Sequence, residues 1–156
     1  MQRRHVIASL GLAFTSRSVL AHHGWSSFDQ DKPIYLEGTA DKVLWRNPHA
    51  EVMLRVAPDM RLPADLAGRA VPPQSAQVDG PKVFSTARLP TRRDAVWEVE
   101  LAPLTRMDAW KVAEIKPGER IALIGFTFSG EKGEAVVRCE YLFVAGKTYG
   151  LRSSPA

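Results

Sequence analysis

Apolar and polar side chains alternate in several short stretches of the chain, and alternation is the period of a half-buried β-strand. Residues 34–45 and residues 50–57 alternate in this way on either side of a turn at Arg46-Asn47-Pro48. Three further strands are predicted over residues 95–101, 120–126 and 134–145. The predicted order therefore begins with two strands joined by a turn and continues with three more strands.

A helical pattern lies between the third and the fourth predicted strand. Leu104, Met107 and Trp110 recur at the spacing of one helix face within residues 103–114, and Pro103 suits a first helical turn. The order β-β-β-α-β-β matches the connectivity of the OB-fold. The sequence thus predicts a mainly β protein, a small OB-fold-like five-stranded barrel with one short helix between strands 3 and 4. A small β-sandwich is the alternative, because one sequence does not give the order of strands in space.

The length of 156 residues fits one domain with a modest core. The predicted barrel domain spans residues 34–150, with an irregular N-terminal arm at residues 22–33 and a C-terminal tail at residues 151–156. Gly38 in the first strand predicts a bulge or a coil in a curved strand. Residues 58–94 are rich in Pro, Ala, Gly and Arg and have little apolar periodicity, which predicts a long Pro-rich insertion or mobile loop.

The first 21 residues have the organisation of a secretory signal peptide. Arg3 and Arg4 form a basic start, residues 6–14 are apolar, and Val19 and Ala21 fit the small-residue rule before a cleavage site. We expect cleavage after Ala21 and a periplasmic or secreted protein, exported by the general secretion route or, given the paired arginines, by the twin-arginine route. The apolar run is too short to cross a bilayer and no later run is long enough, so no transmembrane anchor is expected.

Charge and cysteine content narrow the classes of function. Three of the 21 basic residues lie in the leader, so the mature chain carries 18 basic and 17 acidic residues. Because this leaves almost no surplus of Lys and Arg, nucleic acid is not an expected partner. Cys139 is the single cysteine, which excludes an intramolecular disulfide and a cysteine-based zinc site.

The candidate chemistry lies in the histidines of the mature chain, which stand at two places, His22-His23 and His49. Cleavage after Ala21 gives His22 a free α-amino group beside its imidazole, so one residue can chelate through two nitrogens. A second histidine completes a three-nitrogen histidine brace, and such a ligand set suits Cu(II). His49 follows the rigid Asn47-Pro48 turn and is the favoured partner, with His23 as the competitor.

Four other side chains are assigned supporting roles around this metal site. Trp25 lies in the arm near the histidines and is expected to shield the site or to pin the arm to the barrel. Glu37, Glu98 and Glu100 are carboxylates that can orient an imidazole N–H. The alternative to a metal site is that the histidines are exposed polar residues near a frayed end and in a turn. No catalytic residue and no cofactor other than copper is assigned.

Several motifs together resemble an uncharacterised family of small exported bacterial proteins. They are His22-His23 after the leader, Phe28-Asp29-x-Asp31-Lys32-Pro33, Leu36-x-Gly38-Thr39, Trp45-x-Asn47-Pro48-His49-Ala50, Trp97-Glu98-Val99-Glu100 and Lys116-Pro117-Gly118-Glu119. The resemblance covers most of the mature chain except the insertion at residues 58–94. It implies export and a small β-rich fold, and it marks His22, His23 and His49 as matching positions, but it implies no reaction.

These expectations lead to one functional hypothesis and two alternatives. The hypothesis is a periplasmic copper-binding protein that holds or delivers copper, whose partner is the metal ion and whose further partner would be an envelope protein or a small molecule. The first alternative is a metal-free OB-type interaction module that binds an envelope partner or an oligosaccharide. The second is a copper-dependent oxidase or monooxygenase, but an enzyme is not the favoured interpretation because neither an open coordination position nor a substrate face can be named.

Overall fold

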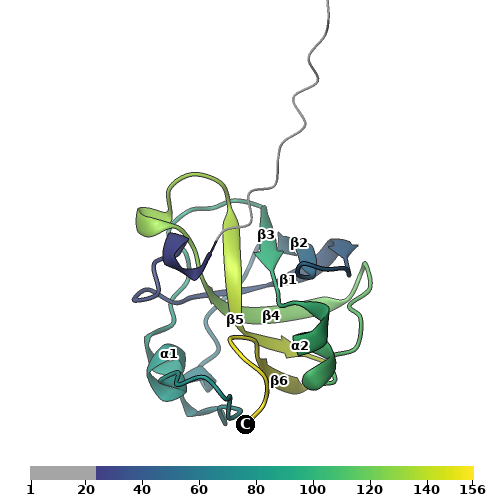
Figure 1. The fold of residues 1–156 in the computed structure, drawn as a ribbon. Coiled ribbons are helices and arrows are strands. Elements are labelled where there is room, and N and C mark those ends of the chain that lie inside the picture. Colours follow the sequence, from purple (N-terminus) through teal and green to yellow (C-terminus); the bar gives the residue numbers. More distant parts are fainter. Residues whose placement is uncertain (1–23) are drawn as a thin grey trace, which may run out of the picture.

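A closed barrel of five strands forms the centre of the protein, in a computed structural model that describes residues 24–156. The strands are β1 (Ile34–Leu44), β2 (Glu51–Val56), β3 (Val96–Glu100), β4 (Arg120–Phe126) and β5 (Val136–Val144). Antiparallel pairing joins β3 to β2, β2 to β1, β1 to β4 and β4 to β5, and a parallel pairing of β3 with β5 closes the ring (Figure 1). The predicted mainly β barrel is confirmed, and the closure rules out a sandwich of two sheets.

The barrel interior is filled by the apolar positions that alternate along the strands. Val52, Leu54, Val99, Leu123 and Val137 are all fully buried, and they belong to one continuous core. Burying a large aliphatic side chain contributes about 1.5–3 kcal/mol relative to leaving it in water. The intervening positions of β2, β3 and β5 therefore face outward, which is where the polar side chains of these strands are found.

Strand β1 is long and curved because it pairs with two neighbours in succession. Residues 34–39 pair with β4, whereas residues 38–44 pair with β2, and the register with β2 shifts between Ala40 and Lys42. The bulge thus lies just beyond Gly38 and not at it. Gly38 is instead required by close approach, since a Cβ atom there would lie 2.1 Å from the carbonyl oxygen of Arg55.

The helix between the third and fourth strands is present as α2 (Leu104–Ala109), with Met107 fully buried against the core. It is shorter than the pattern over residues 103–114 predicts. Lys111 has a φ of 54°, a left-handed conformation in which a right-handed helix does not continue.

A sixth strand, β6 (Lys147–Gly150), pairs antiparallel with the end of β5 and extends the sheet beyond the barrel. The turn consists of Ala145 and Gly146, whose φ angles are 50° and 73°. Two successive positive φ values are typical of the tight turns that join hairpin strands. The sequence analysis ended the last strand at Ala145 and did not include β6.

The insertion at residues 58–94 is folded against the outside of the barrel. It contains the 3₁₀ helix η2 (Leu66–Gly68) and the helix α1 (Gly80–Thr86), whose first turn is capped by the side chain of Asp79. Leu66 and Phe84 are buried in a second apolar cluster together with Tyr35 and Tyr141 of the barrel strands. Isolated apolar residues of this kind give no periodic signal, which explains why the sequence did not predict the helix.

The remaining short elements lie at the N-terminal end of the described chain and in the β4–β5 connection. They are the 3₁₀ helices η1 (Trp25–Ser27) and η3 (Ser129–Glu131). Among residues 24–156, no helix is long and apolar enough to span a membrane.

Candidate metal-binding face

His49 lies in the loop of residues 45–50 that joins β1 to β2, and its side chain is buried at 7% exposure. The backbone around it is fixed by two hydrogen bonds between Ala50 and the residues that directly follow β3, one with Leu101 and one with Ala102. The side-chain oxygen of Asn47 accepts a hydrogen bond of 3.1 Å from the backbone N–H of Leu104, the first residue of α2. The imidazole is therefore carried by a loop that is tied to two other elements.

Glu51 lies beside the imidazole, with a distance of 3.4 Å between Glu51 Oε1 and His49 Nδ1. The two residues are two positions apart, so their side chains are on the same side of the chain. A carboxylate on one ring nitrogen of a histidine fixes the orientation of the ring, and metal-binding histidines commonly have such a partner. The contact therefore suits an imidazole that presents Nε2 to a metal.

The strand pairing places more charged side chains on the same outer face. Glu51 is directly opposite Glu100 of β3, and Glu100 is in turn beside Arg138 of β5. Glu98 lies on this face as well, two positions before Glu100, opposite Met53 of β2. We call His49, Glu51, Glu98, Glu100 and Arg138 the acidic face.

Glu100 and Arg138 form the most buried ion pair of this face. Glu100 Oε2 and Arg138 Nη2 are 2.7 Å apart, and their side chains are 4% and 11% exposed. Removing one partner from a buried ion pair is costly, because the other charge is left without compensation in a poorly solvated place. The pair therefore fixes both side chains firmly.

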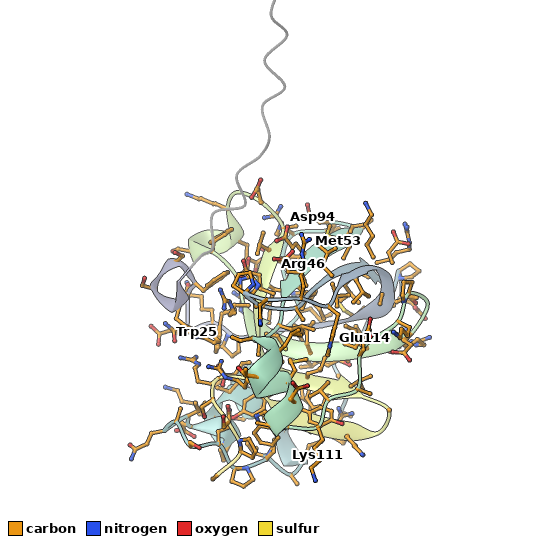
Figure 2. The ribbon with its side chains drawn as sticks, turned by 45° about the vertical axis from the view of Figure 1, so that its right-hand side comes forward. Trp25, Arg46, Met53, Asp94, Lys111 and Glu114 are labelled. Atoms are coloured by element: carbon orange, nitrogen blue, oxygen red, sulfur yellow. The ribbon has the colours of Figure 1, made fainter. Side chains whose placement is uncertain are left out.

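The N-terminal arm is attached to the barrel next to this ion pair. The guanidinium of Arg138 lies 5.5 Å from the ring centre of Trp25 and 5.6 Å from that of Phe28, within the range of cation–π contacts. Trp25, which is labelled in Figure 2, also packs edge-on against Phe126, and the guanidinium of Arg152 is 3.6 Å from its ring centre. Trp25 thus pins the arm to the barrel.

The C-terminal tail supplies the second anchor of the arm. Arg152 bonds through Nε to Glu140 at 2.7 Å and through Nη1 to the side chain of Gln30 at 2.8 Å. The Glu140 carboxylate is fully buried, and it also accepts a hydrogen bond from Gln74 of the insertion. The arm, the tail and the insertion are therefore held together by one polar cluster.

The structure brings some of the residues predicted from the sequence together and separates others. His49, Glu98 and Glu100 share the acidic face, and Trp25 contacts its Arg138. His22 and His23 lie outside the described residues. Glu51 and Arg138 were not singled out from the sequence.

Glu37 belongs to β1 and lies beside the end of β2, whereas His49 lies before the start of β2. Its carbonyl oxygen accepts a hydrogen bond from Ala57, whereas His49 precedes the first residue of the strand. The six residues of β2 separate these places, which corresponds to about 20 Å of extended chain. The Glu37 carboxylate is engaged by Arg120 at 2.7 Å and by the Tyr35 hydroxyl at 3.0 Å.

Other donors for a metal are scarce in the part of the chain that the structure describes. Among residues 24–156, no group of three or more His, Cys, Asp and Glu side chains is arranged to hold a metal ion. Cys139 lies in the barrel core, where burial raises the pKa of its thiol well above the usual value and disfavours the thiolate. Within these residues the acidic face offers one imidazole with carboxylates around it, so a complete metal site would need ligands from outside them.

Comparison with known proteins gives one match. No curated protein and no solved structure matches the chain. A family model matches residues 10–61, a stretch that contains His22, His23 and His49 together with the arm, β1 and β2, and that ends within the first residues of the insertion. The resemblance to an uncharacterised family is thereby confirmed: the chain matches the family of unknown function DUF6152 over residues 10–61.

Proposed function

We propose that the protein is an exported copper-binding protein that holds or delivers copper through a histidine brace. The brace would consist of the α-amino group and imidazole of His22, created by cleavage after Ala21, and the imidazole of His49. The observation that carries the proposal is the position of His49, which is buried beside Glu51 on the face to which the N-terminal arm is attached. His23 is the competing ligand to His49.

The attachment of Trp25 limits how far the new N-terminus can travel from this face. His22 precedes Trp25 by three residues, and an extended chain spans at most about 3.6 Å per residue, so the two residues stay within about 11 Å of each other. A tether of this length keeps the proposed first ligand at a high effective concentration near the barrel. The anchor at Arg138 thus supports a site that combines the N-terminus with the β1–β2 loop.

The charges of the acidic face also suit a bound cation. Glu51, Glu98 and Glu100 supply three carboxylates, and Arg138 is paired with one of them. Negative charge nearby favours the binding of a divalent ion. The nitrogens of an amine and two imidazoles match the preference of Cu(II) for tetragonal nitrogen ligands. Glu51 would hold the His49 ring in the orientation that presents Nε2 to the metal.

The test begins with the processed N-terminus. Intact mass of the exported protein is expected to show cleavage after Ala21, and titration with Cu(II) is expected to give one tight site with nitrogen hyperfine structure in the EPR spectrum. Loss of a side chain that only orients a metal ligand costs about 10–100-fold in metal affinity. His49→Ala removes a proposed ligand itself, so it is expected to cost more than about 100-fold. Glu51→Gln is expected to fall in the 10–100-fold range.

Two further variants make the result specific. A chain with one glycine added before His22 keeps every side chain but displaces the α-amino group, and it is expected to lose the tight site. Glu37→Gln, far from His49, serves as the control and is expected to bind copper unchanged. The brace is refuted if the processed protein starts elsewhere, or if His49→Ala and the extended chain bind copper as tightly as the wild type; His23→Ala then identifies the competing ligand.

The same samples separate this proposal from its alternatives. Peroxide production with ascorbate and oxygen by the copper-loaded protein, together with oxidation of an added polysaccharide, would favour the oxidase or monooxygenase. Failure of the processed protein to bind copper would favour the metal-free module that binds an envelope partner or an oligosaccharide.

A further inference from the structure

A cavity of about 610 Å³ opens at the end of the barrel opposite His49. It lies between the end of β2, the start of β3 and the last part of the insertion. The core residues Leu36 and Trp97 lie behind its inner wall, with 0% and 1% of their surface exposed. The other apolar side chains that line it are Val56, Ala57, Pro58, Met60, Leu89, Pro90 and Ala95. The cavity is therefore open to solvent and is backed by the barrel core.

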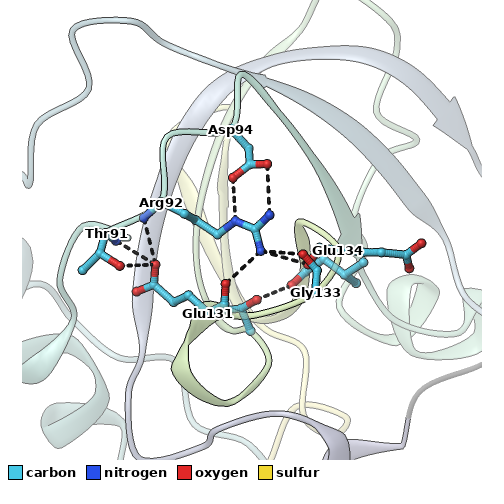
Figure 3. A network of polar contacts seen from close by, with 8 residues as sticks. Thr91, Arg92, Asp94, Glu131, Gly133 and Glu134 are labelled. Carbon is cyan, nitrogen blue, oxygen red and sulfur yellow. Dashed lines mark hydrogen bonds and ion pairs between the residues drawn. The ribbon is translucent and has the colours of Figure 1, made fainter.

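The polar rim of this cavity is held by a network of hydrogen bonds (Figure 3). The guanidinium of Arg92 is paired with Asp94 and donates through Nη1 to the carbonyl oxygens of Glu131 at 2.9 Å and Gly133 at 3.0 Å. The Glu131 carboxylate in turn accepts from the backbone N–H groups of Thr91 and Arg92. The rim segment, residues 91–94, is thus fixed without any ligand, so the cavity is preformed.

The charge of the rim is not balanced. Arg92 is neutralised by Asp94, and its donors are used within the network. Arg93 lines the cavity from an exposed position, and among residues 24–156 no carboxylate lies within ion-pair distance of its guanidinium. The cavity therefore combines an apolar side with a polar rim, and on this rim Arg93 has no carboxylate partner among residues 24–156.

We propose that this cavity binds a small apolar carboxylate, such as a medium-chain fatty acid. Its hydrocarbon part would lie against Val56, Met60 and Leu89, and its carboxylate would pair with Arg93. The volume falls in the range of about 300–1,000 Å³ that is typical of small-molecule sites. The site lies at the far end of β2 from His49, about 20 Å along the strand, and does not depend on copper binding.

Titration of the ¹⁵N-labelled protein with octanoate tests the proposal. The amide signals of the non-proline residues in 57–60 and 89–95 are expected to shift, while those of the non-proline residues in 45–50 around His49 stay unchanged. Octan-1-ol is the neutral analogue with the same chain, and it is expected to bind the same cavity more weakly than octanoate. A partly exposed charge pair contributes up to about 1 kcal/mol, so the expected preference for octanoate is about fivefold.

Three variants complete the test. Arg93→Gln is expected to weaken octanoate about fivefold and to leave octan-1-ol unchanged, whereas Arg46→Gln, an exposed arginine in the β1–β2 loop, is expected to affect neither ligand. Ala57→Leu fills the apolar wall and is expected to weaken both ligands. The proposal is overturned if octanoate shifts no cavity amide at millimolar concentration, if Ala57→Leu binds both ligands like the wild type, or if Arg93→Gln leaves the octanoate affinity unchanged.

Discussion

The carboxylate of Glu131 joins the β4–β5 connection to the end of the insertion. Its side chain is 6% exposed, and Oε2 accepts hydrogen bonds from the backbone N–H and the hydroxyl of Thr91 and from the backbone N–H of Arg92. Oε1 accepts one more from Arg88 at 2.9 Å. Hydrogen bonds to a charged group contribute about 1.5–3 kcal/mol each, but these four share one carboxylate and are not additive. We therefore expect Glu131→Ala to lower the free energy of unfolding by about 3 kcal/mol.

Urea unfolding followed by far-ultraviolet circular dichroism measures this loss, and a fall in Tm of roughly 9 °C should accompany it for a chain of this size. Glu131→Gln keeps an acceptor oxygen but removes the charge, so about half of the loss is expected. Glu134→Ala removes an exposed carboxylate from the same connection and is the control, with an expected change below about 0.5 kcal/mol. A loss below about 0.5 kcal/mol in Glu131→Ala would refute the assigned role of the network.

The hydrogen bonds to the Glu131 carboxylate also predict how the free energy of unfolding depends on pH. Burial raises the pKa of Glu131, but the hydrogen bonds from Arg92, Thr91 and Arg88 outweigh burial and leave the pKa below its usual value. A carboxyl group whose pKa is lower in the folded state than in the unfolded state stabilises the fold when it is ionised. This contribution is complete above the unfolded-state pKa, about 4.3 for Glu, and it is lost as the pH falls through the folded-state pKa. The difference in unfolding free energy between the wild type and Glu131→Gln should therefore be constant near pH 7 and shrink below about pH 4. A difference that is unchanged at pH 3.5 would contradict the pKa direction.

Three further predictions concern the tail, β1 and the core. Arg152→Ala leaves the fully buried Glu140 carboxylate without its ion-pair partner and is expected to cost about 3 kcal/mol in urea unfolding. Gly38→Ala places a Cβ against the Arg55 carbonyl oxygen, which belongs to a paired strand and cannot move away, and it should cost about 3 kcal/mol by the same assay. Cys139 should resist a thiol reagent in the native protein and react once urea unfolds it, because burial raises its thiol pKa and denies access.

Matched controls keep these tests specific. Arg120→Ala removes an ion pair with Glu37 in which the arginine is 71% exposed, so its cost should stay below about 1 kcal/mol. Gly68→Ala adds a Cβ where no atom lies within 4 Å and should change stability far less than Gly38→Ala. Equal losses in either matched pair would contradict the explanation from burial or from close approach, and rapid reaction of native Cys139 would contradict its placement in the core.

The strands of the barrel were predictable because each carries its own signal. The predicted range 120–126 coincides with β4, and the predicted ranges for β1, β2, β3 and β5 each contain the observed strand. Alternation is a property of neighbouring residues, so a single sequence displays it. Strand β6 and α1 were missed for the converse reason, since a four-residue strand after an Ala-Gly turn and a helix with one fully buried phenylalanine leave almost no periodic pattern.

The sequence by itself determined the number and order of the barrel strands, the helix between the third and fourth, and the two places where the histidines stand. Only the tertiary structure decided which charged side chains meet. Closure of the barrel through β3 and β5 brings Arg138 to Glu100 and anchors Trp25 beside them, while the length of β2 separates Glu37 from His49. The physical reason is that side-chain alternation is set by the local backbone, whereas the choice of neighbouring strand is set by the burial of the whole core.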